Sequence, residues 1–287
     1  MKRFDYLAPN SLDDALMMLS ERPEAVALAG GTNVLVQIKE RHREASALLS
    51  LQRIPELHEL RVDDGLHIGA AVTLSQLANE PTIKRDYMAL AAAAGLIGSA
   101  QTRNTATIGG NICNASPSAD TAPPLLVLQT EVVLVGIHGV RTMPLSDFFL
   151  GPGRTALRPA ELLKEIIVPA PKARSGSAYM RHIPRQAMDI SVVGVAAFLQ
   201  LNEAGQITVA RIALGAAAPT PLLAPGSAGQ LKGHKPSRDL WRMAGSIAAQ
   251  EAQPVADLRA SVPFRRHLVN QLTQEALQNA LDNITNQ

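Results

Sequence analysis

Two short glycine-pair segments constrain this chain more than any other feature: AGGTN at residues 29–33 and TIGGN at residues 107–111. Each is embedded in apolar sequence, so we predict a tight turn at the end of a strand in both places. Paired glycines permit positive φ and let backbone N–H groups approach a ligand with no Cβ in the way. Successive N–H groups form a concave anion site suited to a diphosphate, and Thr32 and Thr107 add hydroxyl donors. A tight turn alone is the alternative, but two such segments, each ending in Asn, favour a ligand cradle.

The reactive residue types give no competing site. Cys113 is the one cysteine of the sequence, which excludes an internal disulfide, a multi-cysteine zinc site and an iron–sulfur cluster held by this chain alone. Its neighbours are Asn111, Ile112 and Asn114, so no cation lowers its pKa, and we predict a small buried hydrophobe. The seven histidines form no HxH or HxxxH pair, so we predict no metal site. No Gly-x-Ser-x-Gly, Gly-x-Gly-x-x-Gly or Gly-Lys-Ser/Thr motif supports a hydrolase, a Rossmann fold or a nucleoside triphosphatase.

Composition limits the class of partner. The chain has 287 residues, of which 46% are hydrophobic, and this suggests about two domains. A net charge of +2 and 3% aromatic residues argue against nucleic acid and anionic membranes as partners. No apolar run reaches the roughly 20 residues of a membrane span, and the first residues lack the apolar core of a secretory signal. We therefore expect a soluble, cytoplasmic protein.

Local patterns along the chain mix helices with strands and predict the α+β class. A helix is expected after Asn10 or Ser11, and a hairpin around Asp64-Gly65. Residues 168–178, rich in Pro, Gly and Ser, indicate a break between domains. In the first half of the chain we further expect a strand before AGGTN, a helix or strand after it, a buried strand at 47–51 and a helix-rich stretch at 74–97 interrupted near Pro81. In the second half we expect a hairpin at 131–145, a strand–turn–strand at 190–218 and two closing helices, the last after Ser261.

The segment 116–120, SPSAD, has two interpretations. It caps a helix that starts near Pro123, or it places hydroxyls and the Asp120 carboxylate beside sugar-like hydroxyls of the same ligand. The residues leave both open. On physical grounds the sequence therefore predicts a diphosphate-containing cofactor without identifying it.

The two glycine-pair segments also carry a family resemblance. Together with TRNTATIGGNICNASPSAD (102–120), GPGRTAL (151–157) and PRQAMDIS (184–191), they resemble the FAD-binding medium subunit of the molybdenum hydroxylases, the xanthine dehydrogenase and carbon monoxide dehydrogenase family. The resemblance covers essentially the whole chain and is closest to bacterial xanthine dehydrogenase-type subunits. It implies a vanillyl-alcohol-oxidase-like (PCMH-type) FAD-binding domain made of two sub-domains, residues 1–54 and 55–172, followed by a C-terminal α/β flavoprotein domain, residues 173–287.

The resemblance also implies which residues bind FAD. Backbone N–H groups of the first turn would wrap the diphosphate, and the second glycine pair would form the opposite wall. An apolar side chain would pack on the adenine, an aspartate would contact hydroxyls or the ring edge, and main chain would approach the isoalloxazine. The first turn comprises Leu28, Ala29, Gly30, Gly31, Thr32 and Asn33, and the opposite wall comprises Thr107, Gly109, Gly110 and Asn111. The apolar side chain is that of Ile97, the aspartate is Asp120, and the main chain near the isoalloxazine is that around Leu163.

Two positions depart from the family pattern. Asn33 stands where many relatives carry Asp or Glu, and Arg181 stands where relatives often carry Lys close to the flavin. A cation at that position stabilises the anionic reduced flavin, and we expect Asp189 to orient Arg181. No catalytic residue or metal ligand is predicted in this chain.

The function that the resemblance implies is an electron relay. An iron–sulfur subunit would pass electrons to non-covalent FAD in this chain, which would hand them to NAD+ or another acceptor. A molybdopterin subunit would oxidise the substrate, xanthine or a similar purine, and the assembly would be a dimer of heterotrimers. The alternatives are a self-contained flavin oxidoreductase of the same fold and a cofactor-free binding protein.

Overall fold

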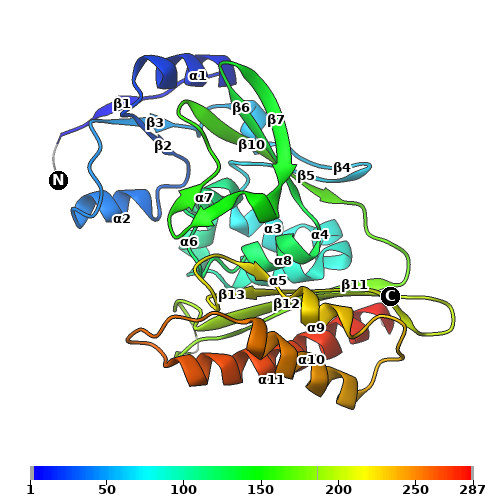
Figure 1. The fold of residues 1–287 in the computed structure, drawn as a ribbon. Helices are drawn as coiled ribbons and strands as arrows, with labels where there is room; N and C mark the ends of the chain where they lie inside the picture. The colour runs from blue at the N-terminus through cyan, green and yellow to red at the C-terminus, as the bar shows by residue number, and fades with distance from the viewer. Residues whose placement is uncertain (1–2, 186, 286–287) are drawn as a thin grey trace.

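The computed structural model describes residues 3–185 and 187–285, which form three sheet-based units in sequence order (Figure 1). We call them the N-terminal unit (residues 5–50), the central unit (residues 60–169) and the C-terminal unit (residues 175–285). Each unit combines a sheet with helices, and the sheets of the central and C-terminal units are antiparallel, which confirms the predicted α+β class.

The N-terminal unit is a small parallel sheet of strand order β1–β3–β2 flanked by two helices. Ser11 caps the first helix as predicted, because its hydroxyl oxygen accepts a hydrogen bond from the N–H of Asp14 at 3.1 Å. The apolar face of that helix joins the core of the central unit, so the two units share buried surface. The elements are β1 (Asp5–Leu7), α1 (Leu12–Glu21), β2 (Val26–Leu28), α2 (Val34–Lys39) and β3 (Ala47–Ser50).

The central unit is built on a five-stranded antiparallel sheet of order β4–β5–β10–β6–β7. The two predicted hairpins are present, and β10 lies between them and pairs with both. A 3-10 turn, η1 (Pro55–His58), precedes the sheet. The remaining elements are β4 (Leu60–Val62), β5 (Gly65–Gly69), β6 (Glu131–Gly136), β7 (Gly139–Pro144), η2 (Leu145–Asp147), β8 (Phe149–Gly151), β9 (Arg154–Thr155) and β10 (Glu161–Pro169).

Six short helices lie between the two hairpins of the central unit. The expected helical stretch at 74–97 is confirmed, with its break before Pro81. Thr73 and Gln76 form a capping box at the start of the helix that begins at Leu74. The segment after the first glycine pair is helical, which settles the alternative left open by the sequence. The helices are α3 (Leu74–Asn79), α4 (Pro81–Asp86), α5 (Met88–Leu96), α6 (Ala100–Thr105), α7 (Ile108–Cys113) and α8 (Ala122–Val127).

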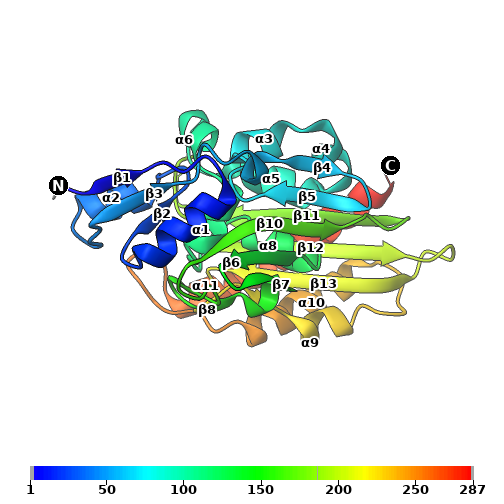
Figure 2. The same cartoon turned by 90° about the horizontal axis from the view of Figure 1, so that it is seen from above.

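The C-terminal unit is an antiparallel sheet of order β11–β12–β13–β14 between two layers of helix. Helices α10 and α11 cover one face, while α5 and α8 of the central unit contact the other (Figure 1). Figure 2 shows β11, β12 and β13 side by side. The elements are β11 (Ser175–His182), β12 (Val193–Leu201), β13 (Ile207–Gly215), β14 (Leu222–Leu223), α9 (Pro225–Gly229), α10 (Arg238–Glu251) and α11 (Val262–Thr285).

None of the helices in the described residues combines the length and apolar character that crossing a bilayer requires. The chain does contain helix α11, of 24 residues, but that helix packs along the C-terminal sheet.

The packing of α11 on β11 depends on Gly176. A Cβ built there would lie 2.4 Å from the carbonyl oxygen of Ala280 and 2.8 Å from Cγ1 of Ile284. We expect Gly176→Val to push the helix from the sheet and lower the free energy of unfolding by about 1–3 kcal/mol. Gly229→Val is the matched control, because no heavy atom lies within 4 Å of a Cβ at that position. Thermal denaturation measures both, and equal melting temperatures would contradict the packing argument.

Candidate functional site

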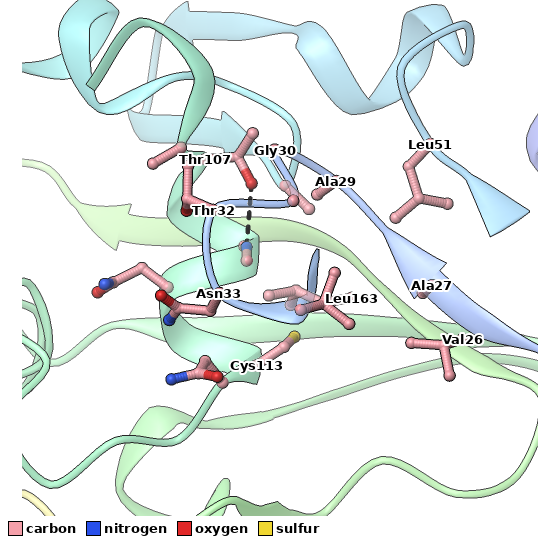
Figure 3. A pocket seen from close by; sticks show the side chains of 18 of the residues that line it. Val26, Ala27, Ala29, Gly30, Thr32, Asn33, Leu51, Thr107, Cys113 and Leu163 are labelled. Carbon is pink, nitrogen blue, oxygen red and sulfur yellow. Dashed lines mark hydrogen bonds between the residues drawn. The ribbon is translucent and has the colours of Figure 1, made fainter. Parts of the chain in front are cut away.

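A cavity of about 460 Å³ lies between the N-terminal and central units. This volume is within the range of roughly 300–1,000 Å³ typical of small-molecule sites. The loop after β2 forms one wall, the α6–α7 segment faces it, and Leu163 of β10 closes one side (Figure 3). The cavity brings together most of the predicted binding residues: Ala29, Gly30, Gly31, Thr32, Asn33, Ile97, Thr107, Gly109, Gly110, Asn111 and Leu163.

Three predicted residues lie outside the cavity lining. Leu28 is 9% exposed and packs in the small core of the N-terminal unit. Asp120 and Arg181 form a buried ion pair with 2.6 Å between oxygen and nitrogen. The cofactor contacts expected of the Leu28 backbone and of the Asp120 and Arg181 side chains stay predictions.

The first wall carries a run of unpaired backbone donors. Within the described residues, no protein group accepts a hydrogen bond from the N–H groups of Gly30, Gly31, Thr32 or Asn33. Gly31 has φ +72, a left-handed conformation that glycine adopts without strain. Consecutive backbone donors without a protein acceptor beside a cavity form a concave site for an anion.

Gly30 sets how closely the two walls approach. A Cβ at this position would lie 2.0 Å from the carbonyl oxygen of Thr105 and 2.9 Å from the Cα of Ala106. Both are backbone atoms that cannot move aside as a side-chain end can. The loop after β2 therefore contacts the end of α6 backbone to backbone, which only glycine permits.

The second glycine pair differs from the predicted strand-end turn. Thr107 is the N-cap of α7, and Gly109 and Gly110 are helical. Their N–H groups already have acceptors: Gly109 donates to the carbonyl of Ala70 at 3.0 Å, and Gly110 to the Thr107 hydroxyl at 3.1 Å, the dashed line in Figure 3. This wall consequently does not offer the free backbone donors that were predicted for it.

The two glycines of α7 have different roles. A Cβ on Gly109 would lie 2.5 Å from the carbonyl oxygen of Ala70, so this glycine allows α7 to pack against the chain that follows β5. A Cβ on Gly110 would meet Thr107 Oγ1 at 3.0 Å and then only the Cβ of Ala29 at 3.8 Å, across the cavity. Any side chain at residue 110 would therefore occupy the cavity itself.

The Asp120 carboxylate is the centre of a buried network. One oxygen accepts hydrogen bonds from the hydroxyls of Tyr179 at 2.6 Å and Ser191 at 2.5 Å, and the other pairs with Arg181. The expectation that Asp189 orients Arg181 was wrong, because Asp189 pairs with Arg185 at 2.9 Å. Asp120 supplies that orientation from a segment 61 residues earlier in the chain.

The ionisable acids that line the cavity within the described chain are poor bases or nucleophiles. Glu161 is paired with Arg141 at 2.7 Å, and this hydrogen bond lowers the pKa of Glu161. Cys113 packs against the main core, and burial raises the pKa of its thiol to about 12. The cavity is therefore equipped to bind rather than to carry out proton transfer or nucleophilic attack.

Two residues of the cavity lining, and one arginine beside it, were missed by sequence reasoning. Arg43 lines the cavity and brings a cation to it, and Gln37 donates to Asn114 across it at 3.4 Å. Arg103 holds the carbonyls of Ile97 and Gly98. Of these, Arg103 stood within the quoted family segment 102–120, whereas Arg43 and Gln37 had no sequence signal.

One histidine lies in a cluster that sequence spacing did not reveal. The ring of His67, on β5, is hydrogen-bonded to Asp64 at 3.1 Å and to Glu165 of β10 at 3.0 Å. Both ring nitrogens are thereby engaged, and none of these three residues lines the cavity.

Comparison with known proteins identifies the two halves of the fold. The family described as the FAD binding domain in molybdopterin dehydrogenase matches residues 2–171, and the carbon monoxide dehydrogenase flavoprotein C-terminal domain matches residues 177–280. The chain is 35% identical to the xanthine dehydrogenase FAD-binding subunit of Escherichia coli O157:H7 over 94% of each sequence. It is 31% identical to the nicotinate dehydrogenase FAD-subunit of Eubacterium barkeri over 99% of this chain and 98% of that one.

The solved structures agree with the sequence matches. The structure of carbon monoxide dehydrogenase from Hydrogenophaga pseudoflava that lacks the Mo-pyranopterin moiety superimposes with a TM-score of 0.94. The match covers 98% of both chains at 33% identity. The fold and the glycine-lined cavity thus define a flavoprotein subunit of the oxidoreductase class. The chain belongs to the FAD-binding medium subunits of the xanthine dehydrogenase and carbon monoxide dehydrogenase family.

The half-buried position of Cys113 and the raised pKa of its thiol lead to a test of its reactivity. With a pKa of about 12, the thiolate fraction at pH 8 is about a thousandfold below that of a thiol near the ordinary value of 9.0. We expect iodoacetamide to alkylate the folded chain at least about a hundredfold more slowly than the chain unfolded in guanidinium chloride. Mass spectrometry of timed samples measures both rates. Similar rates in the two states would show that the thiol is neither buried nor perturbed.

Proposed function

We propose that this chain is the FAD-carrying electron-transfer subunit of a molybdenum hydroxylase complex. The observation that carries the proposal is the run of N–H groups from Gly30 to Asn33, which have no protein acceptor among the described residues and belong to the lining of a cavity that also contains Arg43. Such a run suits an anionic acceptor, and the diphosphate of FAD provides one. The family match to an FAD-binding domain over residues 2–171 supports the same cofactor.

The residues of this chain would bind and orient the cofactor. Gly30 to Asn33 would hold the diphosphate through backbone donors, while Gly110 leaves room beside it and Ile97 and Leu163 offer apolar surface. Bound FAD accepts electrons singly and releases them in pairs, and that chemistry belongs to the cofactor. Consistent with this division, the ionisable acids lining the cavity are held paired or protonated.

The partners and the reaction are part of the proposal. The H. pseudoflava relative is a medium chain of carbon monoxide dehydrogenase, and the E. coli relative is a xanthine dehydrogenase subunit. By analogy, an iron–sulfur subunit delivers electrons to this chain, a molybdopterin subunit oxidises xanthine or a similar purine, and NAD+ or another acceptor removes the electrons. We further propose cytoplasmic location, a dimer of heterotrimers and the domain boundaries 1–54, 55–172 and 173–287.

Gly110→Val tests the cavity as the FAD site. The valine side chain would extend into the cavity, so we expect the Kd for FAD to rise at least about tenfold, a loss of about 1.4 kcal/mol in binding. The melting temperature of the flavin-free chain should stay at that of the control Gly229→Val, whose side chain enters open space. Visible absorbance and fluorescence titration with FAD measure the binding. Unchanged affinity in Gly110→Val would remove the cavity from consideration.

The source and destination of electrons separate the proposal from its alternatives. We expect NADH to bleach the flavin of the isolated chain, whereas xanthine should do so only in a complex that contains iron–sulfur and molybdopterin chains. Anaerobic spectra of the isolated chain and of the co-purified complex provide the measurement. Reduction of the isolated chain by xanthine would favour a self-contained oxidoreductase. A chain that stays colourless after FAD is added would favour a cofactor-free binding protein.

A further inference from the structure

Arg43 is an exposed cation in the lining of the cavity. It lies in the connection between α2 and β3, so the N-terminal unit supplies it. Within the described residues its guanidinium has no ion-pair partner, and Glu40, three residues earlier, faces His42 at 3.5 Å instead. A guanidinium stays charged and presents its N–H donors in a planar fork that matches phosphate oxygens. Arg43 therefore brings an uncommitted positive charge to the cavity.

The chain reversal after α2 brings Arg43 to the cavity. Arg41 adopts a left-handed φ of +63, a conformation that commonly ends a helix. The N–H groups of His42 and Arg43 then both donate to the carbonyl oxygen of Gln37, at 2.8 and 3.2 Å. The side chain of Gln37 lines the cavity and donates to Asn114 of the facing wall at 3.4 Å. The backbone of Arg43 is thus tied to a residue that spans from one wall to the other.

The rest of the lining leaves the charge of Arg43 unmatched. The other ionisable side chains in the described part of the lining are those of Glu161 and Cys113. Glu161 pairs with Arg141 at 2.7 Å, so its negative charge already has a cation of its own. The Cys113 thiol, whose pKa is raised to about 12, is uncharged at neutral pH. The electrostatic character of the cavity is therefore positive, and the side chain that makes it so is Arg43.

We propose that Arg43 is the side-chain counter-ion of the cofactor's phosphate groups, and that it makes cofactor affinity depend on salt. The inference rests on the proposed function, in that the cavity binds FAD, and it adds a specific residue and a sensitivity to ionic strength. Salt screens exposed charges more than partly buried groups. Gly30, Gly31 and Thr32 are half-buried, whereas Arg43 is exposed. The contribution of Arg43 is therefore the one that falls as ionic strength rises.

Two substitutions at residue 43 test the proposal in the full-length chain stripped of flavin. Arg43→Gln removes the charge, and Arg43→Lys keeps it without the planar fork. The matched control is Arg41→Gln, which removes the same charge two residues earlier, from an exposed side chain that does not line the cavity. Each chain is titrated with FAD and with riboflavin, which lacks phosphate, and its melting temperature is recorded without flavin. The titrations are made at about 0.01 M and about 0.15 M salt, where the Debye length is about 30 Å and about 8 Å.

We expect Arg43→Gln to raise the Kd for FAD about tenfold at the lower salt concentration, because a charge-assisted hydrogen bond to phosphate is lost. The rise of the Kd with salt should be steep in the wild type and flatter in this variant. Arg43→Lys should keep most of the salt dependence, since its ammonium retains the charge. Arg41→Gln should match the wild type. Riboflavin should bind Arg43→Gln and the wild type equally, however weakly.

Wild-type affinity and salt dependence in Arg43→Gln would overturn the proposal. So would an equal loss in Arg41→Gln, because the general field of the surface would then explain the effect without a contact. A parallel loss of riboflavin affinity would place Arg43 away from the phosphates, and a loss that only follows a lower melting temperature would indicate a structural role; either result rejects the proposal. If the wild-type chain fails to bind FAD, it is the proposed function that fails, before any variant is compared.

Discussion

The contact between Gly30 and the end of α6 is the constraint on which the rest of the site depends. Because backbone meets backbone there, the N-terminal and central units are held at a separation that no side chain could adjust. That separation leaves the cavity between them, and the N–H groups of its lining residues Gly30 to Asn33 have no protein acceptors in the described part of the chain. A close-packed contact, rather than a reactive side chain, is therefore what creates this binding site.

The three units contribute different things to the site. The N-terminal unit presents backbone donors, and the central unit supplies a packed wall in which α7 satisfies its own N–H groups. The C-terminal unit contacts the end of α5 through Arg181, which donates to the carbonyl oxygen of Leu96. This division suits a subunit whose cofactor carries the chemistry, because what the protein must provide is a fixed and well-shaped environment.

The parts of this architecture that follow from short-range patterns were predictable from sequence. The cap at Ser11, the hairpin at Asp64-Gly65 and the last helix after Ser261 depend on neighbouring residues, and all are present. The second glycine pair was misassigned because an extended threonine before two glycines begins a strand-end turn or a helix equally well. Arg181 was given Asp189 as partner because Asp189 matches an acidic position of the resembled family, whereas the partner in the structure, Asp120, comes from a distant segment. The role of Arg43 had no local signal at all.

Strand β10 gives the site an order of assembly. It pairs with β5, which ends at Gly69, and with β6, which begins at Glu131, and it contributes Leu163 to the cavity. Until residues 161–169 have been synthesised, the two hairpins have no common strand and each keeps an open edge. Such long-range pairing forms late and slowly. More than half of the chain must therefore be synthesised before the strand that carries Leu163 can join the two hairpins and complete that side of the cavity.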